Sequence, residues 1–207
     1  MKKVIESFPA KHFFSTRQMG DMREKNNWTH PENLATGVQV HTNHVEIVNK
    51  PGQYQNTDGL ITNKPGIKLC IFTADCAPLL LVDPNNKIIG NFHCGWKPFV
   101  ADIVKVGIDK MRELGAKNIY AAIGPCINKC CFETGPEVAE AFEKLLGQSC
   151  WKYRHTDLRG GIELRLNQLG ITNVQHIDEC TCCNVDTYFS YRAENGNCGR
   201  LGHVIEL

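Results

Sequence analysis

The 207-residue sequence has no apolar run that approaches the roughly 18 residues a membrane-spanning helix needs. It also has no excess of one charge, because 23 Lys and Arg residues face 22 Asp and Glu residues. A nucleic-acid-binding domain usually carries a clear basic excess, so this balance argues against nucleic acid as a partner. No fixed-period repeat, low-complexity segment or Pro/Gly/Ser linker divides the chain. We therefore expect one domain over residues 1–207, with neither nucleic-acid nor membrane partners.

A secretory signal is also missing from the first residues. The segment MKKVIESFPAKHFF has two lysines but lacks the roughly 7–15-residue apolar core of such a signal. We therefore expect a cytoplasmic protein with reduced thiols. The chain nevertheless contains 11 cysteines, an odd number that cannot pair completely within one chain. These cysteines are interpreted as metal ligands, nucleophiles or small core residues.

Apolar patterns predict several short strands and three helices. The helical patterns begin at Pro98, Pro136 and Asp157 and end at Gly115, Gly147 and Gly170. The strand-like runs are Val38–His41, Val45–Val48, Ile67–Phe72, Leu79–Val82, Lys87–His93, Asn118–Ile123, Val174–Ile177, Tyr188–Arg192 and Leu201–Leu207. Because strands occur in adjacent groups as well as between helices, we expect an α+β fold with mixed or antiparallel sheets flanked by helices.

One segment, residues 73–96, combines a turn with chemically active side chains. Asp83-Pro84-Asn85-Asn86 is a strong turn signal between two apolar runs and predicts an antiparallel hairpin. Cys76 and His93 are equidistant from the centre of this turn, so we expect them opposite each other with Cα atoms roughly 4.5–5.5 Å apart. Simple packing across the hairpin is as good an interpretation of this pair as a functional site. Asp75 adds a carboxylate that would either transfer protons or cap a loop.

A second polar cluster lies upstream, in the run QVHTNHV. Its alternation places Gln39, His41 and Asn43 on one face of an extended stretch. His41 would complete a set of two histidines and Cys76 with an open fourth position, which distinguishes catalytic from structural zinc. The separations of these residues match no short zinc-finger spacing, so spacing alone leaves this question open.

Seven motifs, taken in order along the chain, resemble those of the YfiH/laccase-domain family. They are QVHTNHV, DGLIT, TADCAPLLLVD, NFHCGWK, IGPCINKCCFETG, ECT and FSYR…GR. That family is described as purine nucleoside phosphorylases with adenosine deaminase activity, and earlier as multicopper polyphenol oxidoreductases. The resemblance runs from about Phe13 to the C-terminus. It implies a YfiH-like fold, a zinc triad of His41, Cys76 and His93, and a nucleoside and phosphate as substrates.

The implied chemistry assigns further roles. Zinc with three protein ligands can lower the pKa of water to about 7, and attack of that water on C6 of adenine would give deamination. Phosphorolysis instead requires phosphate at C1′ of the ribose and stabilisation of the departing purine, for which Asp75 is a candidate proton carrier or supporting partner. The substrate and phosphate candidates are Gln39, Asn43, Lys97, Arg192 and Arg200. Lys97 stands where the family usually has arginine in HAGWRG, so it keeps the charge but loses the fork that suits phosphate.

Three other functions remain open at this stage. In a metal-free hydrolase, His93 would activate Cys76 as a nucleophile, and bacterial members of the family have been linked to removing wrong amino acids from cell-wall precursors. A binding module would sense zinc or redox state through its thiols. A copper polyphenol oxidase is the least attractive, because its three-copper cluster needs H-x-H pairs and the eight histidines form none. Zinc is therefore preferred to copper, and the oligomeric state is left open.

The remaining cysteines lie mainly in CINKCC, at 126–131, and CTCC, at 180–183. Together these segments have enough thiols for a four-cysteine zinc site. Only Cys180 and Cys183 show the C-x2-C spacing, and the first segment supplies no second such pair. We therefore expect Cys130 and Cys131 to line a loop at the rim of the site, and Cys182, Cys183 and Cys198 to be incidental thiols.

Overall fold

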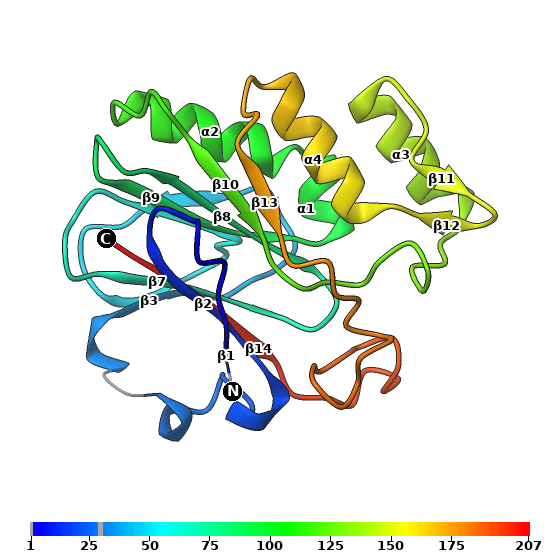
Figure 1. The fold of residues 1–207 in the computed structure, drawn as a ribbon, viewed down its shortest axis with the longest axis horizontal. Coiled ribbons are helices and arrows are strands. Elements are labelled where there is room, and N and C mark those ends of the chain that lie inside the picture. Colours follow the sequence, from blue (N-terminus) through cyan, green and yellow to red (C-terminus); the bar gives the residue numbers. More distant parts are fainter. Residues whose placement is uncertain (1, 29–30) are drawn as a thin grey trace.

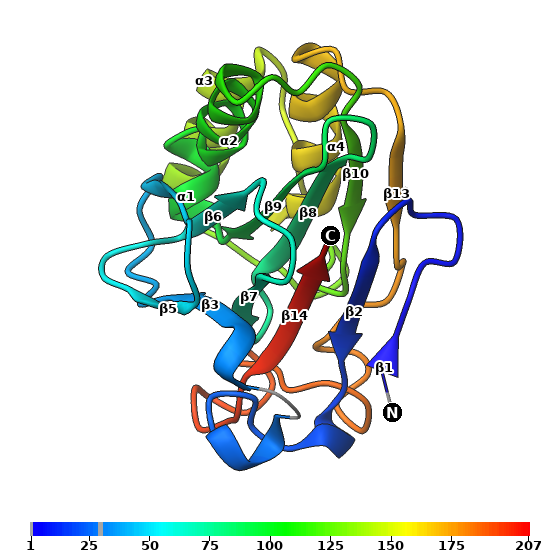
Figure 2. The same cartoon turned by 90° about the vertical axis from the view of Figure 1, so that its left-hand side faces the viewer.

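The computed structural model describes residues 2–28 and 31–207 as two stacked six-stranded sheets with helices over one of them (Figures 1 and 2). Sheet A has the order β1 (Lys2–Lys3), β2 (Lys11–Ser15), β14 (Leu201–Glu206), β7 (Lys68–Thr73), β3 (Leu34–Gly37) and β5 (Gly52–Tyr54). Sheet B has the order β13 (Val174–His176), β10 (Tyr120–Ile123), β8 (Ala77–Asp83), β9 (Ile88–Cys94), β6 (Gly59–Thr62) and β4 (Val45–Ile47). Both sheets contain parallel and antiparallel pairs, so the predicted α+β class with mixed sheets is confirmed.

The helices cover the outer face of sheet B (Figure 1). They are α1 (Trp96–Val100), α2 (Ile103–Glu113), α3 (Pro136–Leu146) and α4 (Leu158–Gln168). A small hairpin of β11 (Trp151–Lys152) and β12 (His155–Thr156) follows α3, and short 3-10 turns span Arg17–Met19, Lys25–Asn27 and Pro31–Asn33. Within the described part of the chain, no helix has the length and apolar character needed to cross a membrane.

Sheet B is buried on both faces, and this explains the apolar run that forms β8. Leu79 and Leu81 belong to the core under the helices, together with Phe142 of α3. Leu80 and Val82 point the other way, into the core between the two sheets. A strand that buries both faces has a nearly continuous apolar sequence.

The predicted elements were confirmed where apolar pattern and capping residues agree. Helix α3 ends at Gly147, which takes the left-handed conformation (φ 72°), and Asp157 caps α4 by accepting the N–H of Gly160. The helix predicted to begin at Pro98 and continue to Gly115 is instead two helices. Asp102 interrupts it with a left-handed φ of 63° and caps α2 by accepting the N–H of Lys105.

Two predicted strands were wrong, at Val38–His41 and at Tyr188–Arg192. Both segments are irregular because buried carboxylates accept their backbone N–H groups in place of a neighbouring strand. Asp58 accepts the N–H of His41, and Asp75 accepts the N–H of Arg192. The same contacts bring both segments to the site described below.

The hairpin formed by β8 and β9 also differs from the prediction in its register. Pro78 rather than Cys76 pairs with His93, because the turn spans residues 84–87. Asp83 stays in the strand while its carboxylate accepts the N–H groups of Asn85 and Asn86. Extending this register by one residue places Cys76 opposite Gly95 and diagonal to His93. Diagonal neighbours on one face remain within reach of each other.

Candidate active site

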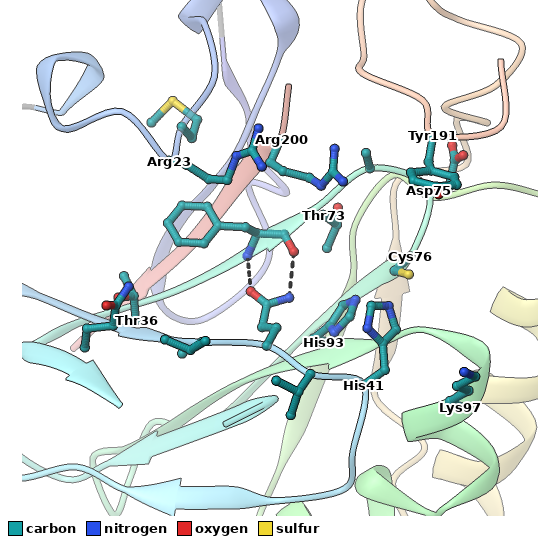
Figure 3. A pocket seen from close by; sticks show the side chains of 18 of the residues that line it. Arg23, Thr36, His41, Thr73, Asp75, Cys76, His93, Lys97, Tyr191 and Arg200 are labelled. Carbon is teal, nitrogen blue, oxygen red and sulfur yellow. Dashed lines mark hydrogen bonds between the residues drawn. The ribbon is translucent and has the colours of Figure 1, made fainter. Parts of the chain in front are cut away.

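Three side chains from separate segments meet at one end of the sheets: His41, Cys76 and His93 (Figure 3). His41 lies between β3 and β4, Cys76 just before β8, and His93 near the end of β9. One ligand atom from each residue lies within 4.8 Å of the others, and the two imidazole centroids are 4.7 Å apart. The structure therefore brings the predicted trio together.

Gly95 leaves the space that the trio occupies. A Cβ atom at this position would lie 2.9 Å from Sγ of Cys76 and 3.3 Å from Cδ2 of His41. Its φ of −72° is available to any residue, so the requirement is for space rather than backbone freedom. A side chain at position 95 would have to displace the thiol of Cys76.

The buried carboxylate of Asp58 organises both histidines. It accepts the backbone N–H groups of Val40, His41 and Thr42 at 3.2, 3.1 and 2.8 Å, and this holds His41 in a left-handed conformation (φ 62°). Oδ1 of Asp58 also lies 2.8 Å from Nδ1 of His93. Because a carboxylate only accepts, Nδ1 of His93 carries a hydrogen, and Nε2 is the ring nitrogen left to contact Cys76 or a metal.

Sequence reasoning missed Asp58. It is the first residue of the DGLIT motif, which served only to support the family resemblance. The available signal was an aspartate directly before a predominantly apolar segment.

Charges in this cluster favour the anionic form of Cys76. Burial by itself raises the pKa of the thiol, but the nearby His93 and hydrogen bonds from both histidines outweigh it and lower the pKa to about 6. Burial disfavours the charged form of His93, yet Cys76 and Asp58 raise its pKa to about 9. The thiolate is the form that binds metals and attacks electrophiles.

Asp75 connects the segment before Cys76 to two other parts of the chain. Its backbone takes a left-handed φ of 83°, and its carboxylate is almost fully buried. Oδ1 accepts the hydroxyl of Thr181 at 2.6 Å, and Oδ2 accepts the N–H of Arg192 at 2.7 Å. The carbonyl of Asp75 accepts the N–H of Ile127. These contacts fit the loop-capping interpretation, and a role in proton transfer stays a prediction.

A cavity of about 1090 Å³ opens beside the trio (Figure 3). Of the predicted substrate residues, Gln39, Lys97, Arg192 and Arg200 line it. The structure does not bring Asn43 there, because this exposed side chain donates to the carbonyl of Ala101. The expectation that Gln39, His41 and Asn43 share one strand face was wrong, since the left-handed His41 turns the chain between them.

Gln39 uses its amide to close the cavity wall. Nε2 donates to the carbonyl of Phe72 at 2.7 Å, and Oε1 accepts the N–H of Phe72 at 2.8 Å. The side chain thus imitates a neighbouring strand beside β7. Its role at the cavity is to anchor the segment that leads to His41.

Three cationic side chains at the cavity contact carbonyl groups or an aromatic ring. Arg200 donates to the carbonyls of Cys198 and Gly199, and Arg192 donates to those of Cys131 and Glu133. Lys97 lies over the ring of Trp96, 5.6 Å from its centroid. Among the described residues, no carboxylate forms an ion pair with Lys97, Arg192 or Arg200. Their uncompensated charge favours an anionic ligand.

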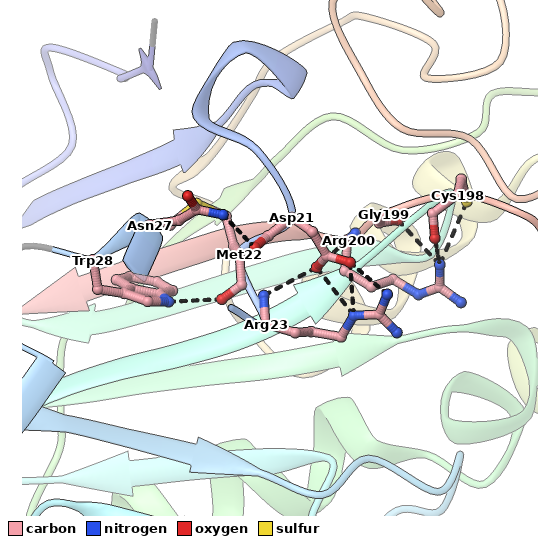
Figure 4. A network of polar contacts seen from close by, with 8 residues as sticks. All are labelled: Asp21, Met22, Arg23, Asn27, Trp28, Cys198, Gly199 and Arg200. Atoms are coloured by element: carbon pink, nitrogen blue, oxygen red, sulfur yellow. Dashed lines mark hydrogen bonds and ion pairs between the residues drawn. The ribbon is translucent and has the colours of Figure 1, made fainter. Parts of the chain in front are cut away.

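Arg23 also lines the cavity and was not anticipated (Figure 4). Its guanidinium pairs with Asp21, and Asp21 in turn accepts the backbone N–H of Arg200 at 3.2 Å. The loop is held by Trp28, whose indole donates to the carbonyl of Met22. This part of the sequence has no periodic pattern, so only the folded chain reveals that Arg23 and Arg200 are neighbours.

The other cysteines are arranged differently from the prediction. Cys130 and Cys131 are not among the residues that line the cavity. Their sulfur atoms instead gather with those of Cys180 and Cys183. Cys183, which was expected to be an incidental thiol, therefore contacts Cys130 and Cys131, because the turn after Cys180 folds back onto the loop that carries them.

Known proteins resemble the chain in both sequence and structure. A family model described as "Multi-copper polyphenol oxidoreductase laccase" matches residues 16–207. A protein of Deinococcus radiodurans named "Purine nucleoside phosphorylase" is 36% identical over 176 residues, covering 82% of this chain and 68% of that protein. "Adenosine deaminase RL5", from an unknown prokaryotic organism, is 33% identical over 168 residues, covering 75% of this chain and 64% of that protein.

Two solved structures share the fold. The hypothetical protein YfiH of Bacillus licheniformis superposes with a TM-score of 0.88 at 23% identity, covering 98% of each chain. YlmD from Geobacillus stearothermophilus superposes with a TM-score of 0.79 at 28% identity, covering 85% of this chain and 74% of that one. The predicted YfiH-like architecture is confirmed.

Proposed function

Because the chain belongs to the multi-copper polyphenol oxidoreductase laccase family, we propose that it is a zinc-dependent enzyme acting on purine nucleosides, by phosphorolysis and by deamination of adenosine. The observation that carries this proposal is the convergence of His41, Cys76 and His93 beside a cavity with uncompensated positive charge. The relatives named as a purine nucleoside phosphorylase and as an adenosine deaminase support it.

The trio suits zinc in its donor chemistry. Two imidazoles and a thiol whose anionic form is favoured are ordinary zinc ligands, and three protein ligands are typical of catalytic sites. The bond from Nδ1 of His93 to Asp58 is the outer contact that a metal-binding histidine usually makes. Zinc bound here would supply a Lewis acid that acidifies water or polarises a substrate oxygen.

Copper fits less well. Two histidines and a cysteine would suit a single copper ion, but a laccase also needs a three-copper cluster held by histidines. Among the described residues, the other cluster with metal-binding groups consists only of cysteines. The part of the chain that the structure describes therefore offers no histidine cluster for polyphenol oxidation.

The cavity accommodates the two substrates of phosphorolysis. Its volume of about 1090 Å³ is slightly above the roughly 300–1,000 Å³ of small-molecule pockets, which leaves room for a nucleoside and phosphate together. Phe132 and Tyr191 offer aromatic surfaces to the base, and Arg200 and Lys97 offer charge to phosphate. During the reaction a phosphate oxygen bonds to C1′ as the bond to the purine breaks, and the purine nitrogen takes up a proton.

A cysteine hydrolase is the second candidate, favoured by the thiol of Cys76 with its pKa near 6 beside His93. In that mechanism the thiolate attacks an amide carbonyl and His93 protonates the leaving amine. Both candidates use the same two residues, so metal dependence separates them.

The decisive experiment measures zinc content and products in parallel. We expect zinc at the trio, release of the free base from inosine only when phosphate is present, and formation of inosine from adenosine. His41→Ala should remove that zinc and both activities. The matched control is His44→Ala, because the side chain of His44 is exposed and lies 3.4 Å from the carboxylate of Glu46. Full activity after exhaustive chelation, together with its loss on alkylation of Cys76, would favour the hydrolase. Cytoplasmic localisation and a single domain over residues 1–207 stay predictions.

A further inference from the structure

A second cluster of metal-binding groups lies apart from the trio. The sulfur atoms of Cys130, Cys131, Cys180 and Cys183 all lie within 4.8 Å of one another. Sγ of Cys183 is 3.5 Å from that of Cys130 and 3.3 Å from that of Cys131. Four thiols in contact, drawn from two loops about 50 residues apart in the chain, form a set that a structural metal site needs.

The separations fit a shared metal ion better than a covalent bond. A tetrahedron with metal–sulfur bonds of about 2.3 Å has sulfur–sulfur edges of about 3.8 Å. A disulfide requires about 2.0 Å between two sulfur atoms and would leave the other two thiols unused. The described cysteines are all free thiols. The cluster thus has the size and the full set of donors for a four-coordinate ion.

Backbone contacts hold the two loops in place around the cluster. The N–H of Asn128 donates to Sγ of Cys180 at 3.4 Å, and the N–H of Thr181 donates to the carbonyl of Cys126 at 3.0 Å. The N–H and side-chain amide of Asn184 both donate to the carbonyl of Cys180. These bonds fold residues 180–184 into a tight turn, so that Cys183 returns to the same side as Cys180.

We propose that Cys130, Cys131, Cys180 and Cys183 bind a structural zinc ion through four thiolates, as a second metal site of this protein. Thiolate ligands select zinc among the common divalent ions, and the absence of a non-protein position suits a structural rather than a catalytic ion. Binding releases the thiol protons to solvent and requires no oxidant. Cys130 and Cys183 are exposed, so an ion can enter from solvent.

The position of the cluster gives the ion a structural task. Thr181, next to Cys180, donates to Asp75, which precedes Cys76. Arg192 donates to the carbonyl of Cys131 and also, through its backbone, to Asp75. An ion at the four cysteines would therefore fasten the loops that hold the segment carrying Cys76. This task does not depend on which reaction the trio performs.

The test uses the full chain, purified under reducing conditions and dialysed against chelator, with zinc counted per chain. Cys183→Ser should lose one zinc relative to the natural chain. Cys182→Ser is the matched control, since it changes the neighbouring thiol outside the cluster and should lose none. Equal zinc in the natural chain and in Cys183→Ser would overturn the proposal. Iron in place of zinc at the cluster would overturn the assignment of the metal.

A second measurement leaves the four cysteines unchanged, so it can be made even if Cys183→Ser does not fold. X-ray absorption of His41→Ala, in which the trio is disabled, should show zinc surrounded only by sulfur, at about 2.3 Å. A nitrogen-containing shell, or an intact mass lowered by a disulfide at Cys183, would contradict the second site. Zinc absent from the trio but present at the cluster would refute the proposed function alone.

Discussion

Oδ1 of Asp58 lies 2.8 Å from Nδ1 of His93, and the same carboxylate accepts the backbone N–H of His41. One buried group therefore fixes the ring of one histidine and the backbone of the other. Burial alone would raise the pKa of this carboxyl, but hydrogen bonds from His93 and from backbone N–H groups lower it. Asp58 stays ionised and balances the positive charge that the site collects.

Replacing Asp58 by Asn should weaken zinc binding at the trio by about 10–100-fold, the usual effect of losing an outer partner of a metal-binding histidine. The amide has nearly the same shape but lacks the charge and one acceptor oxygen. Competition with a chromophoric chelator measures the affinity. Asp109→Asn is the control, because Asp109 is exposed and pairs with Lys105 on α2. Unchanged zinc affinity in Asp58→Asn would show that the carboxylate only folds the loop.

Gly95→Ala should abolish nucleoside turnover while leaving the fold intact. The added Cβ would lie 2.9 Å from Sγ of Cys76, so the thiol must move away from the histidines. Overpacking of this kind costs about 1–3 kcal/mol of stability. Zinc content and activity, measured beside the thermal unfolding temperature, separate a displaced thiol from an unfolded chain. A fully active Gly95→Ala protein would mean that Cys76 does not act at its observed position.

Arg200→Ala should raise KM for phosphate by about tenfold or more, as expected for the loss of a charged hydrogen bond. The nucleoside KM should change little, because Arg200 offers charge rather than an aromatic surface. Initial rates with phosphate varied at saturating inosine give this value. Arg112→Ala is the control, since Arg112 is on α2 and contacts the carbonyl of Leu169. Equal shifts in both KM values would contradict a phosphate role.

Lys97→Arg should lower KM for phosphate several-fold. A guanidinium can donate two parallel hydrogen bonds to phosphate oxygens, whereas an ammonium acts as a point charge. Lys97 is exposed at the cavity and forms no ion pair among the described residues, so the longer side chain has room to reorient. Steady-state kinetics with phosphate as the varied substrate checks this. An unchanged or higher KM would indicate that phosphate binds elsewhere in the cavity.

Acid should destabilise the fold through Asp83. Burial by itself raises the pKa of this carboxyl, but hydrogen bonds from the N–H groups of Lys117, Asn86 and Asn118 and from the Asn86 side chain lower it to about 2. Since the folded pKa lies below the ordinary value of 3.8, the contribution is complete above about pH 4 and is lost as pH falls toward 2. The contribution of the ionised Asp83 to the free energy of unfolding is about 2 kcal/mol.

The corresponding variant is Asp83→Asn, which should lower the free energy of unfolding at neutral pH by about 2 kcal/mol. Urea unfolding of the natural chain and of Asp83→Asn, from pH 7 to pH 2, measures this difference in the free energy of unfolding. The difference between them should shrink toward pH 2, where the natural carboxyl begins to take up its proton. A difference that is constant with pH would assign the effect to shape rather than charge.

Local sequence signals predicted a substantial part of the fold. Apolar patterns and single capping residues determine strand β8 and helices α3 and α4 with their caps. These elements could therefore be predicted from local sequence alone. The register of the β8–β9 hairpin could not, because Asp83 remains in the strand and its side chain stabilises a longer turn. The position of the Asp83 carboxylate also depends on the N–H groups of Lys117 and Asn118, which are distant in the sequence.

The trio could be predicted from the sequence, but the residues that position it and shape the cavity beside it could not. The family motifs indicated His41, Cys76 and His93, whereas Asp58 and Arg23 act through contacts between segments with no shared pattern. His41 shows the physical reason most clearly. Alternation in QVHTN suggested a strand, but the buried charge of Asp58 attracts three consecutive N–H groups and turns the chain. Long-range electrostatics overrode the local pattern.

His41 follows a strand of sheet A, whereas Cys76 directly precedes one strand of sheet B and His93 lies within another. The three ligands therefore lie together only when the two sheets are packed against each other. An ion held by all three residues would therefore link the two sheets, and its loss would loosen their contact at this end of the molecule.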